Sequence, residues 1–64
     1  MEHNDRIIRR KEVIYMTGLS SSTLWRREKE GLFPQRISLG GNSVGWLQSE
    51  VEQWILAASG RRAA

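Results

Sequence analysis

The chain of 64 residues contains no cysteine, one histidine and one proline. Without cysteine, neither a disulfide framework nor a thiolate metal site can support the fold. The histidine, His3, lies in a polar N-terminal stretch, where it forms no Ser-His pair and no metal cluster. Two pairs of glutamates lie on predicted helices: Glu28 with Glu30, and Glu50 with Glu52. Because the two members of each pair are two positions apart, their side chains point away from each other. These carboxylates are expected to affect solubility and helix ends. The sequence therefore indicates a protein that is not an enzyme and that uses no metal or cofactor.

Long hydrophobic runs are also missing, and the first five residues are polar and partly acidic, unlike a signal peptide. We therefore expect a cytoplasmic protein without membrane contact. Ten Lys and Arg against seven Asp and Glu give a formal net charge of +3. This balance suits a polyanionic partner, but many small basic proteins only have a solvated basic surface, so charge alone leaves the partner open.

Helical periodicity predicts a first helix over residues 10–17 that ends at Gly18, since glycine suits the left-handed residue after a helix. Ser20 is then a good N-cap for a second helix over residues 21–30. The short turn at residues 17–20 has the dimensions of a helix-turn-helix.

Residues 35–47 predict a β-hairpin, because polar and apolar residues alternate on both sides of a glycine-rich reversal at residues 40–42. From about Gln48 the apolar spacing becomes that of an amphipathic helix that ends at Gly60, with its N-cap left open. The predicted fold is mainly α-helical with a small β-hairpin: a winged helix-turn-helix over residues 8–60. A flexible arm at 1–7 and a disordered tail at 61–64 are expected beside it.

The second helix has a basic and aromatic outer face when Leu24 is directed inward. Arg26 can donate two hydrogen bonds to a guanine edge, and Lys29 suits a phosphate. An exposed indole at Trp25 either packs on sugar or a thymine methyl, or folds back on the hairpin or a neighbouring arginine. Residues with side-chain hydroxyls stand at the start of this helix, where unpaired backbone N–H groups and the helix dipole favour binding of an anion. The candidate recognition residues are Ser21, Ser22, Thr23, Trp25, Arg26 and Lys29.

Two other sets are candidates for contact with a nucleic-acid backbone. The first set is basic and stands at the start of the first helix: Arg9, Arg10 and Lys11. This position crosses the DNA backbone in a helix-turn-helix, although a cluster of solvated charges would explain the three residues as well. The hairpin has small residues and free N–H groups that can approach a phosphate or a minor groove, although an ordinary turn uses the same glycines. Its candidates are Arg36, Ser38, Gly40, Gly41, Asn42 and Ser43.

Several stretches carry a family resemblance by their order and spacing: Arg10-Lys11-Glu12-Val13, Thr17-Gly18-Leu19-Ser20, Ser22-Thr23-Leu24-Trp25-Arg26, Gly31-Leu32-Phe33-Pro34, Leu39-Gly40-Gly41 and Val44-Gly45-Trp46-Leu47, with Glu50, Val51 and Trp54. Over residues 7–55 the chain resembles the AlpA-like regulators of phages and prophages, relatives of excisionase and MerR-type winged helix domains. Arg27, Leu32 and Asn42 depart from the family pattern. Because a wing arginine is frequent where Asn42 stands, Arg36 is the candidate to supply the charge of the wing.

The resemblance implies a transcriptional regulator of phage or prophage genes that binds double-stranded DNA sequence-specifically. Residues 21–30 would enter the major groove, and residues 35–47 would lie on the backbone or minor groove. An excisionase-like factor that bends DNA is the first alternative, and an adaptor that uses Trp25 to grip an acidic protein is the second. Integrase or RNA polymerase are the candidate protein partners, and a monomer in solution that binds DNA cooperatively fits this picture.

Overall fold

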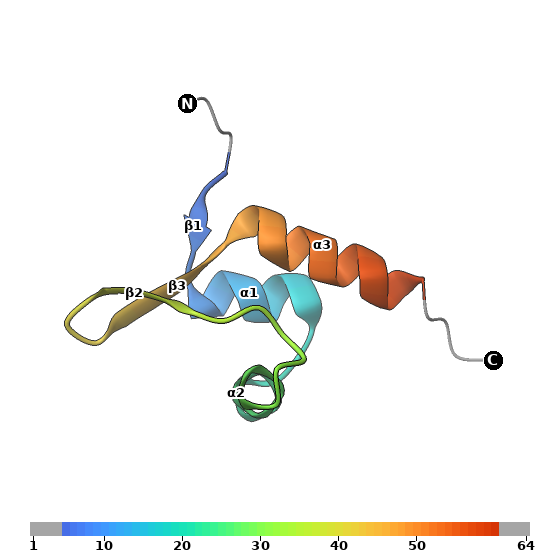
Figure 1. Ribbon diagram of the computed structural model, residues 1–64, viewed down its shortest axis with the longest axis horizontal. Helices are drawn as coiled ribbons and strands as arrows, with labels where there is room; N and C mark the ends of the chain where they lie inside the picture. Colours follow the sequence, from blue (N-terminus) through green and yellow to red (C-terminus); the bar gives the residue numbers. More distant parts are fainter. Residues whose placement is uncertain (1–4, 61–64) are drawn as a thin grey trace.

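The computed structural model describes residues 5–60. Its elements are β1 (Ile7–Ile8), α1 (Arg10–Thr17), α2 (Ser21–Lys29), β2 (Ile37–Gly40), β3 (Ser43–Leu47) and α3 (Gln48–Ser59). The strands form one antiparallel sheet in the order β1-β3-β2. Figure 1 shows the β2–β3 hairpin at one end, α3 toward the other, and α2 on the far side of α1. Three helices with a small sheet in this order are compatible with a winged helix arrangement.

The ends of α1 and α2 follow from their capping residues. Gly18 has a φ of 75°, and its N–H donates to the carbonyl of Ile14 at 2.8 Å, which ends α1 as predicted. The Ser20 hydroxyl accepts from the N–H of Thr23 at 3.2 Å and so caps α2. Helix α2 ends at Lys29, one residue before the predicted end, and Gly31 follows with a φ of 76°.

The predicted hairpin is present as β2 and β3, and the sheet has a third strand, β1, that the sequence did not predict. In β1, Ile7 pairs with Leu47 and Ile8 with Trp46. A strand of two residues is stable here because the Ile8 side chain is buried in the core, 1% exposed. The predicted arm at residues 1–7 thus differs from the structure over its last three residues, while residues 1–4 and the predicted tail at 61–64 lie outside the described part.

The same N-terminal segment caps α3 and so fills the position that the sequence left open. Leu47 precedes α3 and offers no side-chain cap. The Asp5 carboxylate instead accepts from the Ser49 N–H at 3.0 Å and from the Ser49 hydroxyl at 2.7 Å. The N–H of Gln48 donates to the carbonyl of Arg6 at 2.8 Å. The start of α3 is therefore satisfied by residues more than forty positions away in the sequence.

The hairpin is shorter than predicted on its first side, because β2 begins at Ile37 rather than at residue 35. Its tip is a tight reversal in which Gly40 pairs with Ser43, after an irregularity that follows Ser38. Gly41 has a φ of 56°, a conformation that glycine adopts without strain. The glycine-rich reversal was predicted, but the irregularity beside it was not.

The core lies between the sheet and the three helices, and its buried members are Ile8, Val13, Leu24, Phe33, Trp46 and Val51. Trp46 is fully buried, and its indole N–H donates to the carbonyl of Pro34 at 3.1 Å. Trp54 packs edge-on against Phe33 with ring centroids 5.0 Å apart. The two tryptophans therefore hold the loop after α2 against β3 and α3.

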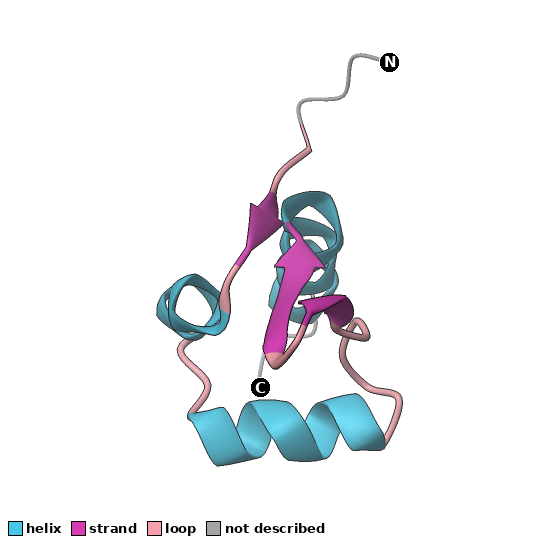
Figure 2. Ribbon diagram, turned by 90° about the vertical axis from the view of Figure 1, so that its left-hand side faces the viewer, coloured by secondary structure: helices cyan, strands magenta, loops and turns pink. Residues whose placement is uncertain are grey.

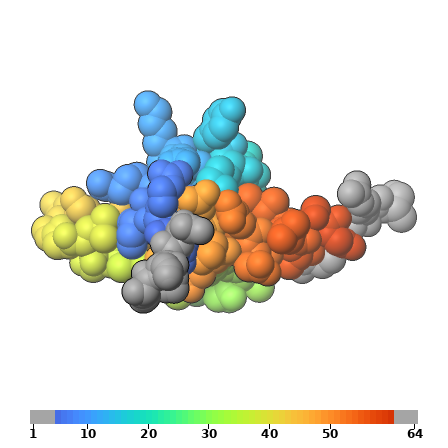
Figure 3. All heavy atoms as spheres, turned by 90° about the horizontal axis from the view of Figure 1, so that it is seen from above, coloured from blue at the N-terminus to red at the C-terminus, as the bar shows by residue number. Residues whose placement is uncertain are grey.

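Helix α2 is the element whose outer side stays uncovered. In Figures 1 and 2 no other described helix or strand lies on the side of α2 that faces away from α1 and the sheet. Figure 3, from the side opposite α2, shows the hairpin and α3 as the two ends of an elongated molecule.

Candidate nucleic-acid interface

The outer face of α2 is exposed, as its sequence predicts. Leu24 is directed inward and is 1% exposed, whereas Trp25 is 53% exposed. The other exposed residues of the face are Ser21, Ser22, Arg26 and Lys29. Thr23 is half-buried, and its hydroxyl accepts a hydrogen bond from Ser20 at 2.9 Å. Thr23 therefore contributes to the cap, while the other five predicted recognition residues form one open surface.

Trp25 has a partner within this surface. The ammonium of Lys29 lies 4.5 Å from the centroid of the Trp25 ring, which is a cation–π distance. The expected alternatives to ligand contact were packing on the hairpin or a neighbouring arginine, and the cation on the Trp25 ring is a lysine instead. Because Trp25 remains half exposed, this contact orients the indole without removing it from the surface.

The start of α1 lies next to the start of α2. Arg10 lines an open hollow together with Ser20, Ser21, Ser22 and Trp25. The two predicted sets of contact residues therefore meet at one place, where the free N–H groups of the α2 N-terminus add partial positive charge. Lys11 is exposed as well.

Arg9 faces the hairpin. Its Nε donates to the carbonyl of Val44 in β3 at 2.9 Å, and the side chain remains exposed. The predicted hairpin residues Ser38, Gly40, Gly41 and Asn42 are exposed, whereas Ser43 is half-buried. Since residues 37–47 contain no charged side chain, Arg9 brings positive charge beside an otherwise neutral hairpin.

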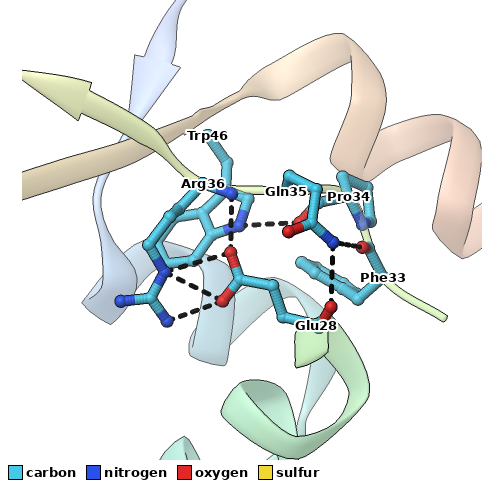
Figure 4. Close-up of polar contacts among 6 residues, drawn as sticks. All are labelled: Glu28, Phe33, Pro34, Gln35, Arg36 and Trp46. Atoms are coloured by element: carbon cyan, nitrogen blue, oxygen red, sulfur yellow. Dashed lines mark hydrogen bonds and ion pairs between the residues drawn. The ribbon is translucent and has the colours of Figure 1, made fainter. Parts of the chain in front are cut away.

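Arg36 is held by an internal ion pair (Figure 4). Its Nη2 and Nε donate to the Glu28 carboxylate at 2.6 and 2.9 Å, and its backbone N–H donates to the same carboxylate at 2.6 Å. The guanidinium also lies 5.6 Å from the centroid of the Trp46 ring. Arg36 precedes β2 rather than lying in the hairpin, and it is half-buried.

Glu28 is the functional candidate that the sequence reasoning missed. It was expected to be a solvated carboxylate, which is wrong, because Glu28 is 5% exposed and points toward the segment before β2. Burial raises the pKa of Glu28, but the hydrogen bonds and the charge of Arg36 outweigh burial and keep that pKa below its ordinary value of 4.5. The Glu28 carboxylate in turn raises the pKa of the Arg36 guanidinium.

Among residues 5–60, no three His, Cys, Asp or Glu side chains come together as a set of metal ligands. No helix in this part of the chain is long and apolar enough to cross a membrane.

Comparison with known proteins gives a family. The model of the family described as prophage CP4-57 regulatory protein (AlpA) matches residues 6–58. An uncharacterized protein of Enterobacteria phage P4, ORF88, is 45% identical over 51 residues, which cover 80% of this chain and 58% of that protein. The DNA-binding transcriptional activator AlpA of Escherichia coli (strain K12) is 36% identical over 56 residues, which cover 78% of this chain and 80% of that protein. The chain thus spans little more than half of the phage P4 relative.

The matched family is one of regulatory proteins rather than of enzymes, and its match covers all of the stretches that carried the resemblance. The chain belongs to the AlpA family of prophage regulatory proteins.

Proposed function

We propose that this chain is a transcriptional regulator of phage or prophage genes that binds double-stranded DNA sequence-specifically, with α2 in the major groove. The observation that carries the proposal is the position of α2: Leu24 anchors its inner side in the core, and its basic, aromatic outer side is exposed. A helix-turn-helix binds DNA through such a face. The relative from Escherichia coli is named a DNA-binding transcriptional activator.

In this arrangement Arg26 reads a base edge, since it is exposed and arginine can donate two parallel hydrogen bonds to guanine. Trp25 supplies apolar contact with a thymine methyl or a sugar, held in orientation by Lys29. Ser21, Ser22 and Arg10 surround one hollow at the start of α2, where a phosphate can accept from them and from backbone N–H groups.

The hairpin acts as the wing. Its tip approaches the backbone through small residues, with Asn42 as the largest polar side chain there. Arg9, joined to β3 through Val44, supplies the positive charge that the wing itself lacks. This assignment moves the wing's charge from Arg36, as expected from the sequence, to Arg9.

The test is the salt dependence of binding to a fluorescent 30-base-pair duplex of random sequence. If Arg9, Arg10 and Lys11 each meet a phosphate, log affinity falls with log salt at a slope of about −2.7 or steeper. Lys11→Gln should make the slope shallower by about 0.9. Arg6→Gln removes an equal charge from a side chain that is paired with Glu12, and it should leave the slope unchanged.

Binding that does not depend on salt would refute the phosphate contacts. Absence of duplex binding at low salt, together with retention of a protein partner, would favour the adaptor hypothesis. Mobility of circularly permuted fragments separates a DNA-bending, excisionase-like factor from a regulator that leaves its site straight.

A further inference from the structure

Arg36 lies at the edge of the candidate interface. It lines the hollow that Arg10 and Ser21 share with Trp25, and it also lines a second hollow on the Lys29 side of the same indole. A cation in this position, beside an exposed recognition face, would ordinarily meet a phosphate of bound DNA.

The guanidinium is nevertheless engaged inside the protein. The Glu28 carboxylate accepts from both Nε and Nη2 of the guanidinium and also from the Arg36 backbone N–H, so Arg36 is held at its side chain and at its backbone. The Glu28 side chain is 6% exposed and that of Arg36 is 32% exposed. Because withdrawing Arg36 would leave a buried carboxylate without its partner, this pair resists exchange with a phosphate far more than a surface pair does.

The same contacts join α2 to the base of the wing. Gln35 donates through Nε2 to the backbone carbonyl of Glu28 at 2.8 Å, and Arg36 lies over the buried Trp46 of β3 (Figure 4). One carboxylate of α2 therefore fixes the chain immediately before β2. The wing is held relative to the recognition face by this residue as well as by the core.

We propose that Glu28 is a positioning residue that acts through Arg36: it keeps this guanidinium out of the phosphate contact and uses it to position the wing against α2. The inference rests on the proposed function. Nonspecific affinity grows with the number of phosphate contacts, whereas base readout does not. A cation that is withheld from phosphates therefore lowers the affinity for DNA of any sequence and makes the salt dependence of binding shallower.

The experiment measures the salt slope on the random-sequence duplex for Glu28→Gln. Glutamine keeps the shape of the side chain but removes the charge that retains Arg36, so Arg36 becomes free to meet a phosphate. The slope should steepen by about 0.9, which makes the loss of affinity between 50 and 200 mM salt about 3.5-fold larger than in the wild type. In the double variant E28Q/R36Q the slope should return to the wild-type value, which identifies Arg36 as the gained contact.

Glu30→Gln is the matched control, since it removes the same charge from an exposed residue directly after α2. Its slope should equal that of the wild type. A wild-type slope in folded E28Q, an equal steepening in E30Q, or a double variant shallower than the wild type would each overturn the inference.

A measurement on the wild-type chain keeps the test decisive should E28Q fail to fold. The Nε–H resonance of Arg36 should keep its chemical shift when the random duplex is added to saturation, because its partner remains Glu28. A large shift would show a phosphate partner and overturn the inference. A wild-type chain that does not bind duplex DNA would refute the proposed function itself, whereas binding with an unchanged E28Q slope refutes only the role of Glu28.

Discussion

At Arg26, charge and hydrogen-bond geometry can be separated by two substitutions. Arg26→Ala should cost about 1–3 kcal/mol on the specific site and much less on random DNA, because a base contact is lost. Arg26→Lys keeps the charge, so it should retain the salt slope while losing most of the preference for the specific site. Both effects are measured by comparing the affinity of each variant for a site selected from a random pool of duplexes with its affinity for the unselected pool. An equal loss on the two pools would remove Arg26 from base readout.

Gly45 is required by the close approach of β1. A Cβ added there would collide with Cγ2 of Ile7 and would lie 3.0 Å from the Ile8 carbonyl oxygen and 3.3 Å from Cδ1 of Leu39. Gly45→Ala should therefore reduce the free energy of unfolding by about 1–3 kcal/mol, measured by chemical denaturation. Gly60→Ala is the control, since its added Cβ meets nothing closer than 3.5 Å. Equal stability of G45A and the wild type would mean that β1 can shift away from residue 45 without loss of folding free energy.

The position of a side chain could be predicted from the sequence where it depends on one helix alone. It could not be predicted where it depends on contact between two segments that are separated in the sequence. The face with Trp25 and Arg26 follows from the turn per residue and from one inward reference, Leu24. Nothing local to Glu28 indicates that a guanidinium eight positions later will fold back onto it. The pairing depends on the path of residues 30–36, which the contacts of Trp46 and Trp54 with that loop determine.

Helix α3 depends on a cap from outside the helix. Asp5→Ala should destabilise the chain by about 0.5–2 kcal/mol, because the Ser49 N–H and hydroxyl lose their acceptor. Asp5→Asn retains an acceptor oxygen but loses the favourable charge near the helix N-terminus, so its loss should be smaller. Thermal unfolding of the wild type, D5N and D5A measures this order of stability. A D5A variant as stable as the wild type would show that water replaces the cap.

At the scale of elements, the three helices could be predicted from local signals: apolar periodicity for α1 and α3, and an N-cap residue for α2. Gly18 and Ser20 mark ends that the structure reproduces. Strand β1 could not be predicted, because two residues have no periodicity and their partners in β3 are some forty positions away. The N-cap of α3 was undecided for the same reason, since Asp5 is close to Ser49 only in the folded chain.

The molecule as a whole should lose stability in acid partly through one internal carboxylate. The pKa of Glu28 in the folded chain lies below its ordinary value of 4.5, since Arg36 favours the charged form more than burial opposes it. The unfolded chain therefore binds more protons than the folded chain between these two pKa values, and stability falls as pH decreases through that window. Above pH 4.5 the contribution of the pair is fully present.

The test compares the free energy of unfolding of the wild type and Glu28→Gln from pH 7 down to pH 2. Glutamine does not titrate, so the wild-type curve should fall more steeply below pH 4.5, by up to about 1.4 kcal/mol per pH unit. The two curves should therefore converge in acid, where Glu28 is protonated and resembles glutamine in charge. Parallel curves over the whole range would show that the Glu28 carboxyl titrates alike in the folded and unfolded chain. The hydrogen bonds and charge of Arg36 would then only balance the burial of Glu28, and the pair would add no acid-dependent stability.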